Sequence, residues 1–183
     1  DAALGDGVDG QVLAPDPSGW DSAAVFAPAV RVDGVSGEVF LFYAGHDGVP
    51  VGGLPGRPAI GLASSPDGAQ FTRSTEGLGG TSLVLDAGEP GAWDGLAVGW
   101  PTVLFDNGRW QMWYRGTDGV TWQVGRATSI DGVHWTRDPS NPVIGAGLEV
   151  PLDADALRIF AQKVSPVSGY QVSGEVSGDV AAL

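Results

Sequence analysis

The sequence predicts an all-β protein built from repeated antiparallel units, and three observations point to this fold class. Glycine and proline are abundant, with 30 and 13 residues among 183. Both are unfavourable inside helices and useful in tight turns, which favours many short strands joined by turns. Aromatic and β-branched residues gather in short runs between those turns, as strands require. Two long segments also match each other in order and spacing, which indicates an internal repeat.

Each repeat contains a Trp-Asp pair, a proline, an aromatic-Tyr-x-Gly run, a Ser-x-Asp-Gly turn and an aromatic-Thr-Arg run. In the first repeat these are Trp20-Asp21, Pro28, residues 42–45, residues 65–68 and residues 71–73. In the second they are Trp93-Asp94, Pro101, residues 113–116, residues 129–132 and residues 135–137. The length differences fall in turns, which tolerate insertions where strands do not. The two segments therefore fold as equivalent units.

Each unit contains four extended runs. In the first unit we expect strands at residues 29–32, 38–43 and 59–64 and in the stretch after Phe71 that closes at residues 83–85. In the second we expect them at residues 102–105, 109–114 and 123–128 and in the stretch from Trp135 to residues 143–144. Turn dipeptides such as Asp33-Gly34 and Asn107-Gly108 separate the runs. Four antiparallel strands per repeated unit describe the blade of a β-propeller.

The repeat divides the chain into four parts. Residues 1–19 are predicted as a strand and linker left from a preceding blade, because residues 11–13 parallel residues 84–85. Residues 20–85 and 86–144 are the two blade repeats. Residues 145–183 lack the repeat pattern, so they form an atypical β segment, either a partial blade or an appendage. Two blades leave open edges, which further blades or self-association would cover.

The charge balance restricts the partners. The chain has 9 basic and 22 acidic residues, a net charge of −13, which repels nucleic acid and anionic membrane surfaces.

There are no cysteines, which excludes disulfides and thiol chemistry. No apolar run approaches the roughly 20 residues that span a bilayer, and residues 1–10 do not resemble a signal peptide. We expect a secreted protein, extracellular or at the cell surface, with no nucleic-acid partner and no membrane insertion.

Five residues near the inner strands are candidates for chemistry. Asp21 and Asp94 precede the innermost strand of each unit, where propeller ligands bind, and are the best candidate catalytic carboxylates. The alternative is that each caps its own turn. Trp20, Trp93 and above all Trp100 are candidates for ligand binding, because an indole can stack on a sugar ring. Core packing is the alternative for all three.

The remaining polar residues have structural interpretations. Asp67 and Asp131 lie in the Ser-x-Asp-Gly turns, where a carboxylate accepts hydrogen bonds from turn N–H groups. Arg31, Arg115 and Arg126 are scarce cations in an acidic chain, so we expect each to pair with a carboxylate. Neither histidine has a partner at the spacing of a catalytic triad or a zinc site.

We expect no cofactor. Asp6, Asp9 and Gly10 form an acidic start that suggests Ca²⁺. However, these residues lack the full alternating series of oxygen ligands of a calcium loop.

The Ser-x-Asp-Gly turns and the stretch from Trp93 to Ile144 resemble the five-bladed propeller glycoside hydrolases of arabinanase, xylosidase and invertase type. The resemblance covers residues 11–144 and implies a carbohydrate partner. It also implies catalytic acids contributed by different blades, with an Asp directly before the inner-strand proline. Here those positions are Ala27 and Trp100, so no catalytic residue can be carried over and enzymatic activity stays open.

The sequence thus predicts a carbohydrate-directed propeller module of glycoside-hydrolase ancestry, which binds glycans and, if further acids are supplied, hydrolyses them. The alternative is a non-catalytic structural, adhesion or self-assembling module.

Overall fold

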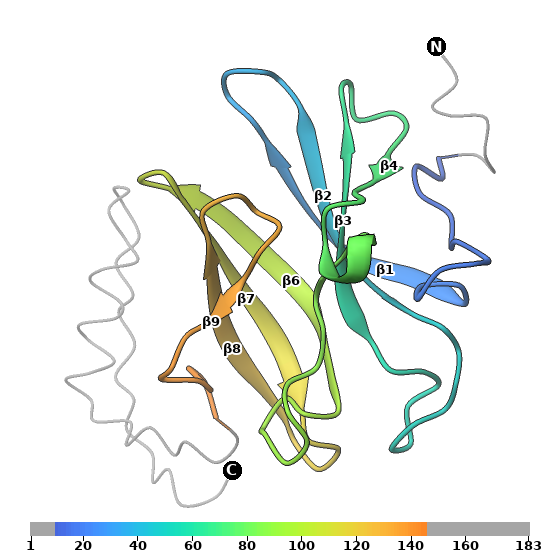
Figure 1. Ribbon diagram of the computed structural model, residues 1–183, viewed down its shortest axis with the longest axis vertical. Coiled ribbons are helices and arrows are strands. Elements are labelled where there is room, and N and C mark those ends of the chain that lie inside the picture. Colours follow the sequence, from blue (N-terminus) through green and yellow to red (C-terminus); the bar gives the residue numbers. More distant parts are fainter. Residues whose placement is uncertain (1–9, 146–183) are drawn as a thin grey trace, which may run out of the picture. The chain divides into compact units, whose positions relative to one another are not determined.

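The computed structural model describes residues 10–145, which form two antiparallel sheets lying side by side (Figure 1). The strands of the first sheet are β1 (Ala24–Val32), β2 (Val39–His46), β3 (Ala59–Ser65), β4 (Thr72–Arg73) and β5 (Leu83–Leu85). Those of the second are β6 (Ala97–Asp106), β7 (Arg109–Thr117), β8 (Trp122–Ser129) and β9 (Thr136–Arg137). The first sheet is called blade 1 and the second blade 2.

The two blades share one topology. Blade 1 has the strand order β1-β2-β3-β4, and β5 pairs with the free part of β3 through Ile60 and Gly61. Blade 2 has the order β6-β7-β8-β9, and a bridge between Val124 and Ile144 takes the place of β5. The prediction of an all-β fold with four-stranded antiparallel blades is confirmed.

Helix is almost absent from residues 10–145, where a single 3-10 turn, η1 (Leu78–Gly80), precedes β5. Within that range no helix is long and apolar enough to cross a membrane.

The inner strands begin five residues earlier than the sequence predicts. β1 starts at Ala24 and β6 at Ala97, whereas the expected starts followed the prolines at Pro28 and Pro101. A proline is tolerated inside a strand at a bulge, and the pairing of β1 with β2 skips between Phe26 and Ala29. The same irregularity recurs in β6, so both prolines lie inside the strands.

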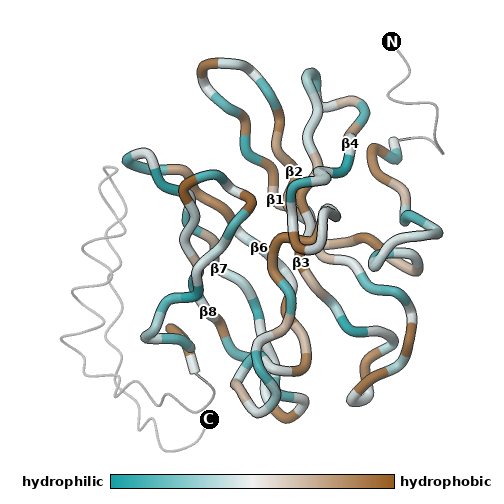
Figure 2. Tube along the Cα trace, viewed as in Figure 1, coloured by the Kyte–Doolittle hydropathy of each residue, from teal (hydrophilic) through white to brown (hydrophobic). Residues whose placement is uncertain are grey.

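The hydrophobic core lies between the two blades. Phe42 and Ile60 of blade 1 and Val98, Trp110 and Met112 of blade 2 are among its members, and β6 packs against β1, β2 and β3. Figure 2 shows a stretch of hydrophobic residues near β3, between the two sheets. Alternate residues of β2 and β7 point to this seam, which follows from the two-residue period of strands.

The described part of the N-terminal segment differs from the prediction. Residues 11–13 are not in a strand, and the carbonyl of Val12 accepts one backbone hydrogen bond, from Phe71 N–H at 3.3 Å. The equivalent β5 is a strand because two residues of β3 pair with it. The predictions for residues 1–9 and 146–183, including the Ca²⁺ candidates Asp6 and Asp9, lie outside the described residues.

Candidate functional site

Asp21 lies in a buried cluster within blade 1. Its side chain is fully buried, and Oδ2 accepts hydrogen bonds from Arg73 Nε at 3.0 Å and Nη2 at 2.6 Å. Arg73 Nη2 also donates to the carbonyl of Ala14 at 2.6 Å. Trp20 stacks on Tyr43, with ring centroids 5.8 Å apart. Burial raises the pKa of Tyr43 to about 12, so this phenol stays protonated at neutral pH.

Blade 2 repeats the cluster. Asp94 accepts hydrogen bonds from Arg137 Nε at 2.8 Å and from the Tyr114 hydroxyl at 3.0 Å. Arg137 Nη2 also donates to the main-chain carbonyl of Asp86. The rings of Trp93 and Tyr114 are 5.7 Å apart, and burial raises the Tyr114 pKa above its usual range. The arginine of each aromatic-Thr-Arg run therefore holds the aspartate of its own Trp-Asp pair.

A glycine behind each aspartate makes room for this cluster. A Cβ added to Gly45 would lie 2.7 Å from Asp21 Cβ, and one added to Gly116 would lie 2.5 Å from Asp94 Cβ. Both distances are shorter than any van der Waals contact, so the aromatic-Tyr-x-Gly run requires its glycine for packing.

The two candidate carboxylates are not brought together. Asp21 and Asp94 occupy separate blades, are 0% and 1% exposed, and are each paired with one arginine. A buried and paired carboxylate cannot reach a substrate oxygen, so the geometry favours the structural interpretation of both. Trp20 and Trp93 lie inside the same clusters, where their rings pack on tyrosine and glycine.

Asp67 and Asp131 lie in the two Ser-x-Asp-Gly turns. Asp67 accepts a hydrogen bond from Ser65 Oγ at 3.1 Å, and Ser65 Oγ accepts one from Gly68 N–H at 2.9 Å. Asp131 accepts the main-chain N–H of His134 at 2.8 Å and contacts its Nδ1 at 2.8 Å. Burial raises the pKa of Asp131, but the hydrogen bonds that it accepts, above all those from His134, lower the pKa by more. The resulting pKa is well below its usual value.

The inner strands carry an unusual backbone at equivalent positions. Ala27 has a φ of 50° and Trp100 a φ of 51°, and each precedes the inner-strand proline. Non-glycine residues rarely adopt positive φ, which costs of the order of 1–3 kcal/mol and clusters at functional sites. These are the positions where the resemblance implies a catalytic aspartate.

Trp100 belongs to an exposed aromatic group. Its ring meets those of Phe26 at 5.4 Å and Trp122 at 5.3 Å, both edge to face. The guanidinium carbon of Arg115 lies over both indoles, 5.0 Å from the Trp100 centroid and 4.8 Å from that of Trp122. Trp100 is 38% exposed. Phe26, Trp100, Arg115 and Trp122 are called the Trp100 cluster.

Arg115 differs from its prediction. Arg126 pairs with Asp138 at 3.3 Å as expected, but neither Arg31 nor Arg115 forms an ion pair within residues 10–145. The two indoles hold Arg115 in place of a carboxylate. Sequence reasoning missed this because Trp122, the first residue of β8, lies outside the expected strand at residues 123–128.

Blade 1 shows the role of the positions that are equivalent to Arg115 and Trp122. By the strand registers, Arg115 and Trp122 occupy the places of Ala44 and Pro58 in blade 1. The Pro58 carbonyl accepts Val98 N–H at 3.1 Å, and a Cβ on Gly99 would meet Ala44 at 3.5 Å. Blade 1 thus has small residues where it packs on the next blade, and blade 2 has a cation and an indole.

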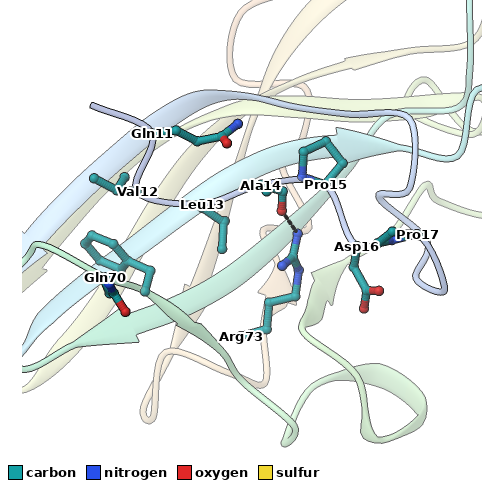
Figure 3. Close-up of a pocket in the computed structure, with 10 residues that line it drawn as sticks. Gln11, Val12, Leu13, Ala14, Pro15, Asp16, Pro17, Gln70 and Arg73 are labelled. Carbon is teal, nitrogen blue, oxygen red and sulfur yellow. Dashed lines mark hydrogen bonds between the residues drawn. The ribbon is translucent and has the colours of Figure 1, made fainter. Parts of the chain in front are cut away.

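A 460 Å³ pocket lies elsewhere, between residues 11–17 and β4 (Figure 3). Its two charged side chains are already engaged. Arg73 binds Ala14 and Asp21, and Asp16 accepts hydrogen bonds from the N–H and hydroxyl of Ser18. In the described part of the chain, no group of three His, Cys, Asp or Glu side chains could hold a metal ion.

Sequence comparison finds relatives over part of the chain. No protein-family model matches. Uncharacterized proteins from two strains of Mycobacterium tuberculosis are each 34% identical over 92 residues, which cover 46% of this chain and 28% of theirs. The chain therefore spans well under half the length of the curated relatives it matches.

Solved structures share the fold. A family 117 glycoside hydrolase of Zobellia galactanivorans is 22% identical, with a TM-score of 0.59 over 74% of this chain and 38% of its own. An endo-1,4-β-xylanase of Bacteroides thetaiotaomicron is 17% identical, with a TM-score of 0.55 over 76% and 42%. A glycosyl hydrolase of Bacteroides ovatus is 25% identical, with a TM-score of 0.51 over 64% and 32%. The described residues are two blades of the glycoside hydrolase-like propeller fold.

Proposed function

We propose that the two blades form part of the wall of a glycan-binding site in a larger, secreted propeller, and that Trp100 stacks on a sugar ring. The observation that carries this proposal is the half-exposed indole of Trp100 at a strained, positive-φ position of the inner strand. Ala27 has the same backbone conformation at the equivalent position of blade 1, so the fold does not require the indole. An indole offers a sugar an apolar face and a free N–H group.

Binding, rather than hydrolysis, is the role proposed for these two blades. Glycoside cleavage needs two accessible carboxyl groups about 5–10 Å apart. Asp21 and Asp94 are buried and neutralised, and the positions before the inner prolines hold Ala27 and Trp100. If the whole protein is a hydrolase, its catalytic acids are residues other than Asp21 and Asp94.

The test is a titration with neutral oligosaccharides, such as arabinan, xylan and mannan fragments, followed by calorimetry. Trp100→Ala is expected to weaken binding about 10-fold or more, because stacking on an aromatic ring contributes most of the affinity at such a site. Leu104→Ala is the matched control, since Leu104 is an exposed apolar residue of the same strand outside the Trp100 cluster. Equal glycan affinities for the wild-type, Trp100→Ala and Leu104→Ala proteins would refute the assignment of the site.

The second candidate function is a structural, adhesion or self-assembling module. The buried Asp-Arg clusters favour it, because they serve only the blades themselves. Light scattering coupled to size-exclusion chromatography distinguishes a monomer from a self-assembled oligomer. A particle of 18.7 kDa indicates a monomer, whereas a discrete dimer or trimer indicates blades completed between chains. Failure of the chain to bind any glycan, together with assembly, would favour this second function.

A further inference from the structure

We propose that the ligand of the Trp100 cluster carries a carboxylate, as in a uronic acid, and that Arg115 binds it. This inference rests on the proposed glycan binding and names the class of sugar. It starts from the position of one guanidinium over the faces of two indoles.

The geometry leaves the donors of Arg115 available. The guanidinium is planar, with its N–H groups directed outward in its own plane. The guanidinium carbon lies 5.0 Å from the Trp100 centroid and 4.8 Å from the Trp122 centroid, and because the two rings are inclined at 82°, the planar group can stack on only one of them. The edge that faces the second indole uses part of the five N–H donors, and the remaining donors are oriented in advance for a bond to a carboxylate.

The charge pattern points the same way. Four other arginines of the described range are paired with aspartates: Arg57, Arg73, Arg126 and Arg137. Arg115 has no carboxylate partner between residues 10 and 145, although the chain contains 22 acidic residues and 9 basic ones. An exposed cation held away from abundant carboxylates is complementary to an anion supplied from outside.

The spacing suits one sugar residue. A uronic acid carries its carboxylate on the carbon next to the ring oxygen, so the anionic group lies one bond from the pyranose ring. A ring that stacks on the exposed part of Trp100 brings this carboxylate to Arg115, whose guanidinium carbon lies 5.0 Å from the indole centroid. One ligand can therefore use both the apolar face and the cation.

Comparison of the blades shows that the fold does not require this cation. The positions of Arg115 and Trp122 hold Ala44 and Pro58 in blade 1, where they pack on β6. A blade packed on blade 2 in the same way would meet an arginine and an indole instead. Blade 2 also has Trp100 where the inner strand of blade 1 has Ala27. The two blades therefore differ at three positions that form the cluster.

The test compares oligogalacturonate with its methyl ester, which keeps the ring and removes the charge. Wild-type protein is expected to bind the acid about 10–100-fold more tightly than the ester, and added salt is expected to reduce that ratio. Arg115→Gln should abolish the preference, so that the acid and the ester bind with equal affinity, whereas Arg115→Lys should restore part of the preference. Arg109→Gln is the matched control, because Arg109 is an exposed arginine of the same strand.

The outcomes separate the two proposals. If the ester binds as tightly as the acid and Arg115→Gln changes neither, the carboxylate inference is wrong and glycan binding stands. If neither ligand nor any neutral glycan binds, both proposals fail. If Arg115→Gln lowers the free energy of unfolding much more than Arg109→Gln without changing the acid preference, Arg115 is a packing residue and the inference is overturned.

Discussion

The ion pair between Asp94 and Arg137 offers the sharpest test of how a blade is stabilised. We predict that Asp94→Asn destabilises the protein strongly while leaving the shape of the side chain unchanged. The substitution removes the negative charge of the carboxylate that accepts a hydrogen bond from Arg137 Nε at 2.8 Å. The Tyr114 hydroxyl, 3.0 Å away, can still donate to the amide oxygen. The cost therefore arises from the arginine that loses its counter-charge.

Burial sets the size of this effect. Breaking a buried ion pair by removing one partner costs about 3–5 kcal/mol. The Asp94 side chain is 2% exposed, but that of Arg137 is 34% exposed, so water recovers part of the loss. We expect the free energy of unfolding to fall by about 2–3 kcal/mol, with a Tm lower by about 5–10 °C.

Urea unfolding followed by tryptophan fluorescence and far-UV circular dichroism measures the change. Asp86→Asn is the matched control, because Asp86 pairs with Arg57 on the surface, with side chains 41% and 47% exposed. Exposed pairs contribute up to about 1 kcal/mol, so this control should lose less than that. Similar small losses for both variants would refute the argument that the Asp94 cluster holds blade 2 together.

Two further predictions concern the same clusters. Gly116→Ala places a Cβ 2.7 Å from the Trp93 ring and should cost about 2–3 kcal/mol by overpacking, measured by urea unfolding. Gly34→Ala, with no atom within 4 Å of the added Cβ, should change stability by less than about 0.5 kcal/mol. The pKa of Tyr43 is raised from 10.0 to about 12 in the folded state, so folding favours the protonated phenol. Its contribution is complete below pH 10 and is lost as the pH rises through 12, and Tyr43→Phe should flatten this part of a stability-versus-pH curve.

The sequence predicted the blade architecture because the repeat carries it. The repeated units and their antiparallel strands follow from short apolar runs between turn dipeptides, and the structure confirms them. The inner strands were predicted too short because Pro28 and Pro101 suggested a strand start. A positive φ at Ala27 and Trp100 accommodates each proline within a bulge, and sequence alone does not reveal such a backbone.

The candidate site was predicted only in part. Trp100 was identified because blade 1 has alanine at the same position, but Arg115 and Trp122 were not connected with it, since β7 and β8 bring them to it in space. The Asp-Arg clusters had a usable signal. An aspartate and an arginine repeat together in both units, and residues that recur as a pair often touch. Asp21 and Asp94 could have been assigned to structure on that basis.

The arginine in the fourth strand of each blade also bonds to the chain segment that precedes the inner strand. Arg73 reaches the carbonyl of Ala14, and Arg137 reaches that of Asp86. The same arginine thus connects the fourth strand to the segment that precedes the inner strand, at Ala14 in blade 1 and at Asp86 in blade 2. Arg73 and Arg137 follow their partner carbonyls by 59 and 51 residues, so during synthesis each bond can form only after the fourth strand of its blade has been made.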